Sequence, residues 1–488
     1  MGELLKNLID GKWADSANGT TFDDINPANK AEAMGTIPRS DHRDVDRAVE
    51  SARTHFVDWS RVSAIQRGDF LYRAAAILHE RADGLANAIV LETGKRLAEA
   101  HMEVHDGVSV LRAIASEGSR LRGAALPFQR PEAFAIAVPV PMGVVAVITH
   151  WSFPLVGCVW TLASALTAGN TVVLKPAEDA PLVATRLAEI FLDAGLPLGT
   201  ISLVHGYGEE AGAPLVRHPD VALVSFTGSP DVGREVGITC AAEQKRFSLD
   251  MGERCVVFVL EDADLEVAVE GVVGEGFATS GQRWRGAVRV FVHRRVMKEF
   301  SERLVARVQT LTLGDGISAA TDIGPIINDA QLKRVHGRTR IGLRDGARLL
   351  CGGEVVRDGD CRRGFYYAPT VFGDATPKMR SVQDDIRGPM VALLTVTGLE
   401  EAIDQANVVS HDMAAAVFTR DLTKALRISE GVGAARTHVN PVPSEPGKPL
   451  PLSAFSRCSR VRRDAVLQNL NDFGAWKEVT IDSARTRP

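Results

Sequence analysis

The sequence has few of the residues that build metal clusters and disulfide frameworks. Its 488 residues include six cysteines, and no two of them form a Cys-x-x-Cys pair. This scatter argues against a structural zinc site and against a disulfide framework, and it fits a reducing compartment. We therefore expect a cytoplasmic chain that holds no metal.

Long apolar runs are also missing. No stretch is apolar over the roughly 20 residues that a membrane-spanning helix needs. Residues 1–10 carry charges and lack an apolar segment followed by a cleavage site, so they do not resemble a secretory signal. The net charge of -5 at pH 7 gives no reason to expect nucleic acid or an anionic membrane as a partner.

The composition is that of a globular protein, with 45% hydrophobic and 24% charged residues. A chain of this length exceeds one hydrophobic core, so we expect two or more domains. Residues 171–176, 201–205 and 221–226 are typical of buried strands, and residues 181–194 are typical of a helix. Strand, helix and strand at these spacings predict parallel pairing and a doubly wound α/β sheet.

The flanking regions carry further signals. Residues 44–56 place their apolar side chains on one helical face, and residues 65–121 predict helix in two or three pieces. Residues 128–141 alternate weakly and contain prolines, which is typical of an edge strand or projecting arm. Residues 476–481 predict a short strand near the C-terminus.

One segment carries a resemblance to a known family. Residues 277–284, Phe-Ala-Thr-Ser-Gly-Gln-Arg-Trp, resemble the Gly-Gln-x-Cys segment of the aldehyde dehydrogenase superfamily, and the resemblance covers nearly the whole chain. In that family the cysteine attacks the aldehyde carbon. Trp284 stands at its place, and indole offers one N–H donor and no nucleophilic heteroatom.

The resemblance implies an aldehyde dehydrogenase-like α/β fold. It implies a Rossmann-type cofactor domain in residues 1–121 and 142–250, and a catalytic-type domain in residues 251–450. An oligomerisation arm and strand are expected in residues 122–141 and 474–488. Residues 451–473 are expected to lead the chain from the catalytic-type domain back to this strand. Because the family's arms extend a neighbour's sheet, we expect a homodimer or homotetramer.

The adenosine half of the implied NAD site is well matched. Lys175 and Glu178 match the residues at the adenine ribose, and the acidic one disfavours a 2′-phosphate. The turn after residue 226 matches the one that receives the pyrophosphate at a helix N-terminus. The cofactor residues expected here are Lys175, Glu178, Phe226, Gly228, Ser229 and Gly233.

The reactive half departs from the family. Ser152 stands where the family has the asparagine of the oxyanion hole, and Asp250 stands where it has the general-base glutamate. Asp385 is short for the nicotinamide ribose, and Arg387 replaces an apolar contact of the ring. NAD therefore remains a possible cofactor, with binding in doubt on the nicotinamide side.

Other residues were weighed for the chemistry. Asp250 is the best candidate base, although it could equally be an ion-paired side chain. Ser280 and Cys255 match no family nucleophile. Ser152 with His150 suggests a nucleophile and base, but residues two apart need not bring their side chains together. Three arginines are expected to cluster at the inner cavity and to pair with nearby acids: Arg283, Arg285 and Arg387, with Glu253, Asp384 and Asp385.

Three functions remain open on this basis. The favoured one is a ligand-binding pseudoenzyme or a repurposed acid–base catalyst that does not oxidise aldehydes by the thiohemiacetal route. The second is an NAD(P)-dependent oxidoreductase that acts on an aldehyde or imine without a covalent intermediate. The third is a non-catalytic scaffold subunit of an active paralogue. The sequence leaves the small-molecule ligand unidentified.

Overall fold

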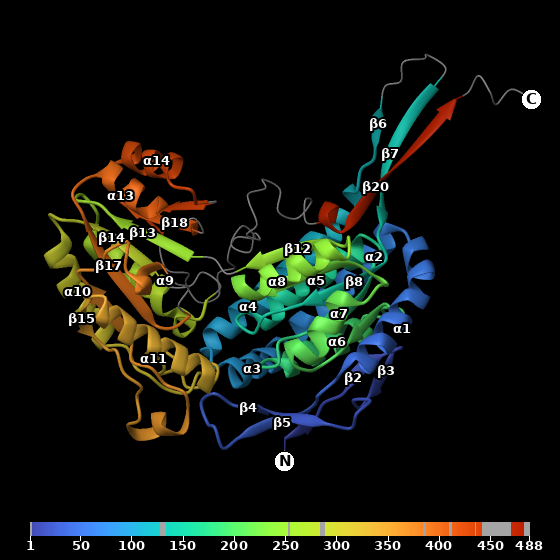
Figure 1. Cartoon of the computed structure of the whole chain (residues 1–488), viewed down its shortest axis with the longest axis horizontal. Helices are drawn as coiled ribbons and strands as arrows, with labels where there is room; N and C mark the ends of the chain where they lie inside the picture. Colours follow the sequence, from blue (N-terminus) through green and yellow to red (C-terminus); the bar gives the residue numbers. More distant parts are fainter. Residues whose placement is uncertain are drawn as a thin grey trace, which may run out of the picture.

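The fold is given by a computed structural model of the chain. It describes residues 2–126, 133–251, 254–283, 288–383, 387–408, 412–434, 436–441 and 470–482. Two lobes, each built around a twisted sheet, face one another, and a narrow three-stranded arm projects from one of them (Figure 1). The predicted α/β fold with a parallel, doubly wound sheet is confirmed.

The first lobe is organised around a seven-stranded sheet in the order β12-β11-β8-β9-β10-β2-β3. The first five of these strands are parallel, and β2 and β3 add an antiparallel edge. The strands are β2 (Asn7–Ile9), β3 (Lys12–Ala14), β8 (Val144–Ile148), β9 (Thr171–Lys175), β10 (Ile201–Leu203), β11 (Val221–Gly228) and β12 (Arg246–Met251).

Helices cover both faces of this sheet. Sequence signals fix several of their ends: Ser63 and Gln66 form a capping box, Gly94 ends a helix with φ 71°, and α5 and α6 begin with proline. The predicted helical region 65–121 is three α-helices. The helices are α1 (His42–Arg61), α2 (Ala64–Glu80), α3 (Ala82–Thr93), α4 (Leu97–Glu117), α5 (Pro154–Thr167), α6 (Pro181–Asp193), α7 (Ala213–Arg217) and α8 (Pro230–Ala242).

The second lobe has its own seven-stranded sheet, in the order β15-β16-β17-β14-β13-β18-β19, parallel except for β15. Its strands are β13 (Arg254–Val259), β14 (Val288–His293), β15 (Arg348–Cys351), β16 (Thr370–Gly373), β17 (Met390–Val396), β18 (Asp412–Phe418) and β19 (Arg436–Val439). Its helices are α9 (Leu265–Phe277), α10 (Met297–Gln309), α11 (Asp329–Arg344), α12 (Arg380–Gln383), α13 (Leu399–Asn407) and α14 (Leu422–Gly431).

Four short helical turns and a small sheet complete the lobes. The turns are η1 (Gly118–Arg120), η2 (Gly208–Gly212), η3 (Ala278–Gly281) and η4 (Gly359–Arg363), and the sheet is formed by β1 (Glu3–Leu4), β5 (Ala33–Pro38) and β4 (Thr21–Ile25). The chain passes from the first large sheet to the second between β12 and β13. The domain boundaries implied by the resemblance stay a prediction.

The arm joins two distant parts of the sequence. Strand β20 (Gly474–Asp482) pairs antiparallel with β7 (Ala133–Pro141) along its whole length, and β6 (Ala124–Leu126) lies on the other side of β7. Both strands were predicted. The prediction for the first began at residue 128, whereas residues 127–132 lie outside the described ranges and β7 begins at Ala133. Phe134 and Trp476 are half exposed on this arm.

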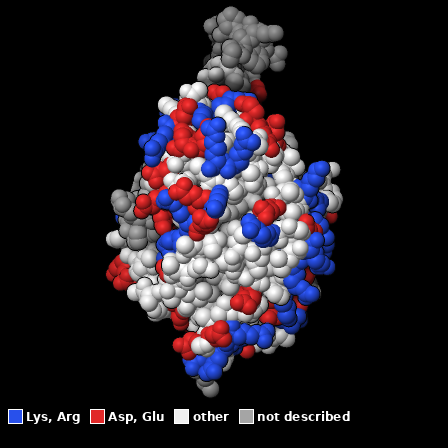
Figure 2. Space-filling view, turned by 90° about the vertical axis from the view of Figure 1, so that its left-hand side faces the viewer, with Lys and Arg blue, Asp and Glu red and all other residues white. Residues whose placement is uncertain are grey.

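The surface of the second lobe mixes both signs of charge. On the face that carries α10 and α14, lysine and arginine are interspersed with aspartate and glutamate (Figure 2). Pairs such as Arg303–Glu299 and Arg427–Glu400 account for part of this pattern. Within the described ranges, no helix is long and apolar enough to cross a membrane.

Candidate functional site

The carboxyl ends of β8, β9 and β11 meet at one edge of the first sheet. From β8 the chain moves through α5 to β9 and through α6 to β10, and it then returns to place β11 on the other side of β8. Such a reversal of strand order opens a crevice at the carboxyl ends, which is where ligands bind in doubly wound folds. The residues after β8, β9 and β11 therefore form the candidate site.

On one side of the crevice, Lys175 ends β9. Its ammonium group donates to the Pro176 carbonyl oxygen at 2.8 Å and pairs with Glu178 Oε2 at 3.1 Å. The sequence argument treated these two as exposed charges, which is wrong for Lys175, because the residue is only 2% exposed. The buried ammonium is held by one carboxylate and one carbonyl oxygen, and it can also donate to a polar ligand group at the mouth of the crevice. Glu178 is more accessible there.

At the end of β11, which β8 separates from β9, α8 begins with its N-terminus at the same edge of the sheet. Ser229 caps the helix, and its hydroxyl accepts the Val232 N–H at 3.4 Å. The first N–H groups of a helix lack intrahelical partners and favour anions, so this end suits a pyrophosphate. The donor set of the described residues therefore fits the adenosine and phosphate part of a dinucleotide.

The glycines near this turn serve the packing of the protein itself. A Cβ on Gly228 would lie 2.3 Å from Cζ of Phe226, and a Cβ on Gly233 would lie 2.6 Å from Sδ of Met251. Phe226 is itself buried in the core. The contribution of these three residues to a ligand site is therefore to hold α8 close against the sheet.

The loop between β8 and α5 follows the strand that lies between β9 and β11. Ser152, 1% exposed, places its hydroxyl oxygen 3.1 Å from Nδ1 of His150. The expectation that these side chains need not meet is thus wrong. Nε2 of the same ring lies 3.3 Å from Nη1 of Arg387, which belongs to the second lobe. Desolvation of the imidazole and the nearby Arg387 charge lower the pKa of His150 well below its usual value.

Asp250 lies in β12, the edge strand, opposite Thr227 of β11, and it is half-buried. The two other weighed nucleophiles are engaged elsewhere: Ser280 donates its hydroxyl to the Gly324 carbonyl at 2.8 Å, and Cys255 is buried in the core of the second lobe. Neither side chain faces the crevice as a reactive group. Asp250 remains the candidate base.

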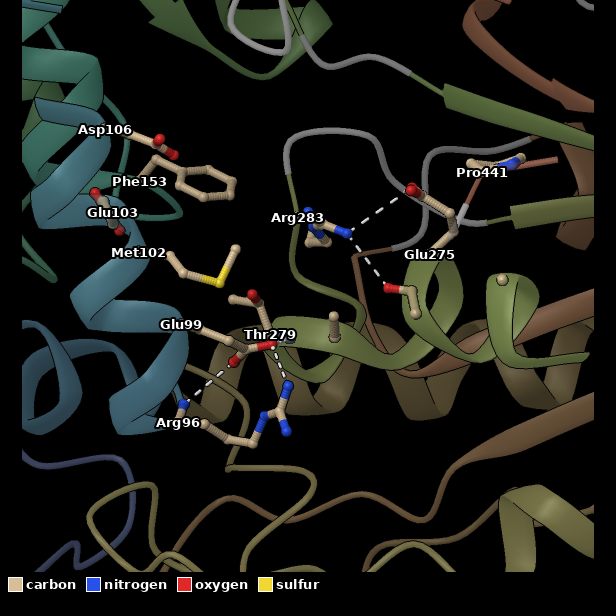
Figure 3. Close-up of a pocket in the computed structure, with 13 residues that line it drawn as sticks. Arg96, Glu99, Met102, Glu103, Asp106, Phe153, Glu275, Thr279, Arg283 and Pro441 are labelled. Atoms are coloured by element: carbon tan, nitrogen blue, oxygen red, sulfur yellow. Dashed lines mark hydrogen bonds and ion pairs between the residues drawn. The ribbon is translucent and has the colours of Figure 1, made fainter. Parts of the chain in front are cut away.

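A cavity of about 140 Å³ lies beside this loop, between α4 and α9 (Figure 3). Glu99 of α4 pairs with Arg96 at 3.2 Å and accepts the backbone N–H of Thr279 at 2.8 Å. On the facing side, Arg283 lies 3.9 Å from Glu275 and donates to a backbone carbonyl. The lining residues are Arg96, Glu99, Met102, Glu103, Asp106, Phe153, Gly271, Gly274, Glu275, Ala278, Thr279, Arg283 and Pro441.

The expected arginine cluster is only partly formed by the described residues. Arg283 lines the cavity and pairs with Glu275, which the sequence argument did not foresee, whereas Arg387 contacts His150 and is not among the lining residues.

The turn at the cavity wall is strained. Thr279 and Ser280 have φ values of 54° and 57°, a left-handed conformation that side chains with a Cβ rarely adopt. Each such residue costs about 1–3 kcal/mol and persists only where its surroundings hold it, and such residues cluster at functional sites. Here Glu99 holds the N–H of Thr279, and Gly324 accepts the hydroxyl of Ser280.

A buried ion pair supports the same loop from behind. Lys95 pairs with Glu103, both almost fully buried, and Lys95 lies 4.0 Å from the centre of the Phe153 ring. The other oxygen of Glu103 accepts the N–H groups of Leu155 and Val156 at 2.9 and 3.2 Å, at the start of α5. The pair thus fixes the segment that carries Ser152.

Several expected site residues lie outside the described part of the chain. They are Trp284, Arg285, Glu253, Asp384 and Asp385, together with residues 451–469. The described residues bring together no group of three or more His, Cys, Asp or Glu side chains that could hold a metal ion.

The comparisons with known proteins agree with one another. The model of the family described as "Aldehyde dehydrogenase family" matches residues 13–458. Alpha-ketoglutaric semialdehyde dehydrogenase of Bacillus subtilis (strain 168) is 36% identical over 434 residues, which are 89% of this chain and 89% of the relative. This chain belongs to the aldehyde dehydrogenase family.

Solved structures of the family have the same fold. Betaine aldehyde dehydrogenase from Staphylococcus aureus in complex with NAD+ is 29% identical, with a TM-score of 0.92, and the match covers 99% of this chain and 95% of that chain. A double mutant of the same enzyme, also with NAD+, is 29% identical with a TM-score of 0.93 and covers 99% and 98% of the two chains.

These relatives overturn the favoured sequence interpretation. A pseudoenzyme, or a catalyst that does not oxidise aldehydes, was expected from the departures around Trp284. The proteins of the aldehyde dehydrogenase family that the chain matches over most of its length are named as aldehyde dehydrogenases. The description of the chain as a non-oxidising member is therefore wrong.

Some residues of the site were not predicted from the sequence. Glu99 and Glu103 stand four residues apart on α4, so they share one helix face, and Lys95 lies just before that helix. Charged residues on the helix face that also carries Ala100, Val104 and Gly107 were a usable signal of a buried polar network. Nothing in the spacing, however, indicates that Thr279 of the second lobe is their partner.

Proposed function

We propose that the chain is an NAD-dependent aldehyde dehydrogenase, which converts an aldehyde to the corresponding acid. The observation that carries the proposal is the meeting of two features at one sheet edge. Lys175 and Glu178 follow β9 and the N-terminus of α8 follows β11, while Ser152, with the neighbouring cavity, follows β8 between them. Membership in the aldehyde dehydrogenase family supports it.

The cofactor would be held mainly by its adenosine half. When bound, NAD supplies an acceptor for the hydride that leaves the aldehyde carbon. We assign Glu178 and Lys175 to the adenosine ribose, and Ser229 with the first N–H groups of α8 to the pyrophosphate. Phe226, Gly228 and Gly233 hold that turn in place.

The nicotinamide half is proposed with fewer contacts. Asp385 is the candidate for the ribose on that side, by its place in the sequence. Arg387 is also assigned there, although its guanidinium lies against His150 in the structure. A cation held by an imidazole is a different neighbour for the nicotinamide ring from the apolar side chain expected of the family.

We further propose that Trp284 occupies the position of the family's nucleophilic cysteine. Indole supplies a single N–H donor and bulk, so the reaction at this site depends on the groups around position 284 to polarise the carbonyl and to activate water. Ser152 and Asp250 are the proposed groups, the first as a hydrogen-bond donor and the second as a base.

The test is the formation of NADH at 340 nm by the purified full-length chain. The relatives are named for α-ketoglutaric semialdehyde and for betaine aldehyde, so these two and a neutral aliphatic aldehyde form the first panel. We expect NADH and the acid in equal amounts with at least one aldehyde. No NADH with any aldehyde, while calorimetry detects NAD+ binding, would contradict the proposed reaction. Arg427→Met, which breaks an exposed ion pair, is a control variant and should form NADH as the unsubstituted chain does.

Two broader features complete the proposal. The arm of β6, β7 and β20, with Phe134 and Trp476 half exposed, is assigned to contacts between copies in a homodimer or homotetramer. A cytoplasmic location is favoured by the cysteines, because those in the described ranges are free thiols: Cys158, Cys240, Cys255, Cys351 and Cys361.

A further inference from the structure

The side chains of Arg387, His150 and Ser152 form a chain of contacts. Arg387 and Ser152 differ from the family's pattern, and the pair of His150 with Ser152 was not favoured from the sequence. Arg387, 7% exposed, places Nη1 3.3 Å from Nε2 of His150, and Nδ1 of the same ring lies 3.1 Å from Oγ of Ser152. The backbone carbonyl of Arg387 accepts the side-chain N–H of Gln331 at 2.9 Å, so the arginine is anchored in the second lobe. The contacts thus cross between the two lobes.

The direction of these hydrogen bonds follows from the chemistry of the groups. A guanidinium only donates, so Nε2 of His150 has to accept from Arg387. The ring is neutral, because its desolvation and the Arg387 charge both lower the pKa of His150. A neutral imidazole that accepts at Nε2 carries its proton on Nδ1. Nδ1–H then donates to Oγ of Ser152, which leaves the hydroxyl proton to be donated to another acceptor.

A second arrangement competes with this one. The backbone N–H of Ser152 lies 3.0 Å from Nδ1, and with Nδ1 unprotonated both the N–H and the hydroxyl of Ser152 would donate to it. Nε2–H would then face the guanidinium of Arg387, donor against a full positive charge, whereas the first arrangement sets Nδ1–H against the neutral backbone N–H of Ser152. A hydrogen bond from a charged donor is roughly twice as strong as a neutral one. The fixed charge of Arg387 therefore favours the arrangement with the proton on Nδ1.

Ser152 and Arg387 are connected to the cavity and its strained turn through their neighbours in the sequence. Ser152 directly precedes Phe153, which lines the cavity. Gly388, next to Arg387, presses its carbonyl against Gly281, where a Cβ would lie 2.0 Å from that oxygen. The segment that leads to position 284 is thereby held beside the Arg387 segment. The contact chain therefore runs from Arg387, beside Gly388, to Ser152, beside Phe153 of the cavity wall.

We propose that Arg387 and His150 are positioning residues, which orient the Ser152 hydroxyl so that its proton is donated to the carbonyl oxygen of the bound aldehyde. The proposal rests on the proposed function. The hydrogen bond strengthens as negative charge develops on that oxygen, and no proton has to be transferred. His150 is then neither the base nor a titrating group of the reaction.

Neutron diffraction from a deuterium-exchanged crystal of the full chain tests the orientation directly. We expect a deuteron on Nδ1 of His150 in the native protein, and on Nε2 in Arg387→Met. A native deuteron on Nε2 would overturn the proposal, because Ser152 would then donate to His150 as the nucleophile of a Ser–His pair does. This readout requires no turnover, so it separates a failure of the inference from a failure of the proposed function.

Kinetics test the catalytic consequence. We expect Ser152→Ala to lower kcat/KM for the aldehyde by about 10²-fold, as for other lost oxyanion donors. With NAD+ saturating, so that any loss of cofactor binding is compensated, Arg387→Met and His150→Phe are expected to lower it by about tenfold and to have no further effect when combined with Ser152→Ala, since they act through that hydroxyl. An equal loss from Arg387→Met in both backgrounds would contradict the proposal. Thermal unfolding of each variant identifies losses that are due to misfolding, and Arg427→Met is the matched control.

Discussion

The two halves of the crevice are built in different ways. The half proposed for the adenosine comes from two short segments, Lys175 to Glu178 and the turn from Phe226 to Gly233, each at the end of its own strand. The reactive half is assembled from α4, the loop after β8, the turn at Thr279 and the segment of Arg387. A site formed by local segments follows from strand and helix signals, whereas a site assembled across two lobes does not.

The halves also differ in how they are supported. The adenosine half relies on backbone N–H groups and close packing of α8, which many sequences provide. The reactive half depends on buried charges, among them Lys95 with Glu103, and on a turn held in a strained conformation by Glu99. We therefore expect single substitutions to harm the reactive half more.

The largest effect is expected at Lys95. Lys95→Met leaves the Glu103 carboxylate buried without its cation, which typically costs about 3–5 kcal/mol. Denaturant unfolding of the variant should show a lower free energy of unfolding by that amount. Arg427→Met, which breaks an exposed pair with Glu400, should change it by less than about 1 kcal/mol. Equal effects of the two substitutions would contradict the expectation that the reactive half depends on its buried charges.

A smaller effect is expected at Glu99. Glu99→Ala removes the acceptor for the Thr279 N–H, so the free energy of unfolding should fall by about 1–3 kcal/mol and aldehyde turnover should fall with it. Glu99→Gln keeps an oxygen at the same place and should retain most of both. If alanine and glutamine variants behave alike, Glu99 acts by its charge and does not hold the turn.

Behind the adenosine half, a pH dependence is expected from Asp24. Burial raises the pKa of Asp24 to about 7, while Glu92 beside it accepts the N–H groups of Leu182 and Val183 at the start of α6. The folded state then holds a proton that the unfolded chain releases above about pH 4, so the free energy of unfolding falls as pH rises from about 4 to about 7. In urea unfolding across this range, Asp24→Asn should remove the part of that decline that is due to Asp24, while Glu92, whose pKa burial also raises, keeps its own part. A native profile that rises over this range would contradict the raised pKa.

The smallest effect is expected at Glu178. Glu178→Gln removes the charge that disfavours a 2′-phosphate, so the preference for NAD+ over NADP+ in dissociation constants should fall by about tenfold, which is about 1.4 kcal/mol. Calorimetric titration of both dinucleotides measures it. Glu189→Gln, on the outer face of α6, is the control and should leave the ratio unchanged. An unchanged ratio in Glu178→Gln would show that Glu178 does not contact the ribose.

Most of the fold could be predicted, and only half of the site could. The strands around Lys175 and Phe226, and the helices after them, follow from apolar runs and stop signals a few residues apart. The approach of Arg387 to His150, and of Glu99 to Thr279, depends on how one lobe sits on the other, which no local pattern encodes. The burial of Lys175 was missed for the same reason, since a charged residue at a strand end is more often exposed.

Function was mispredicted for a different reason. Each departure around position 284 was judged by the atom that it removes from the family's pattern. The structure places an imidazole, a guanidinium and a hydroxyl in contact nearby, so atoms removed at one position are accompanied by new ones at others. Comparing residues with the family's pattern one at a time shows which functional atoms are missing, but it cannot show contacts that form between residues far apart in the sequence.

The pairing of β20 with β7 has a consequence for synthesis on the ribosome. Strand β7 emerges early, but the partner for one of its edges is made only with residues 474–482. Throughout most of translation that edge offers unpaired N–H and C=O groups beside apolar side chains such as Phe134, and such an edge invites pairing with other nascent chains. We therefore expect a chain that stalls before β20 is made to aggregate more readily than one in which β20 covers this edge.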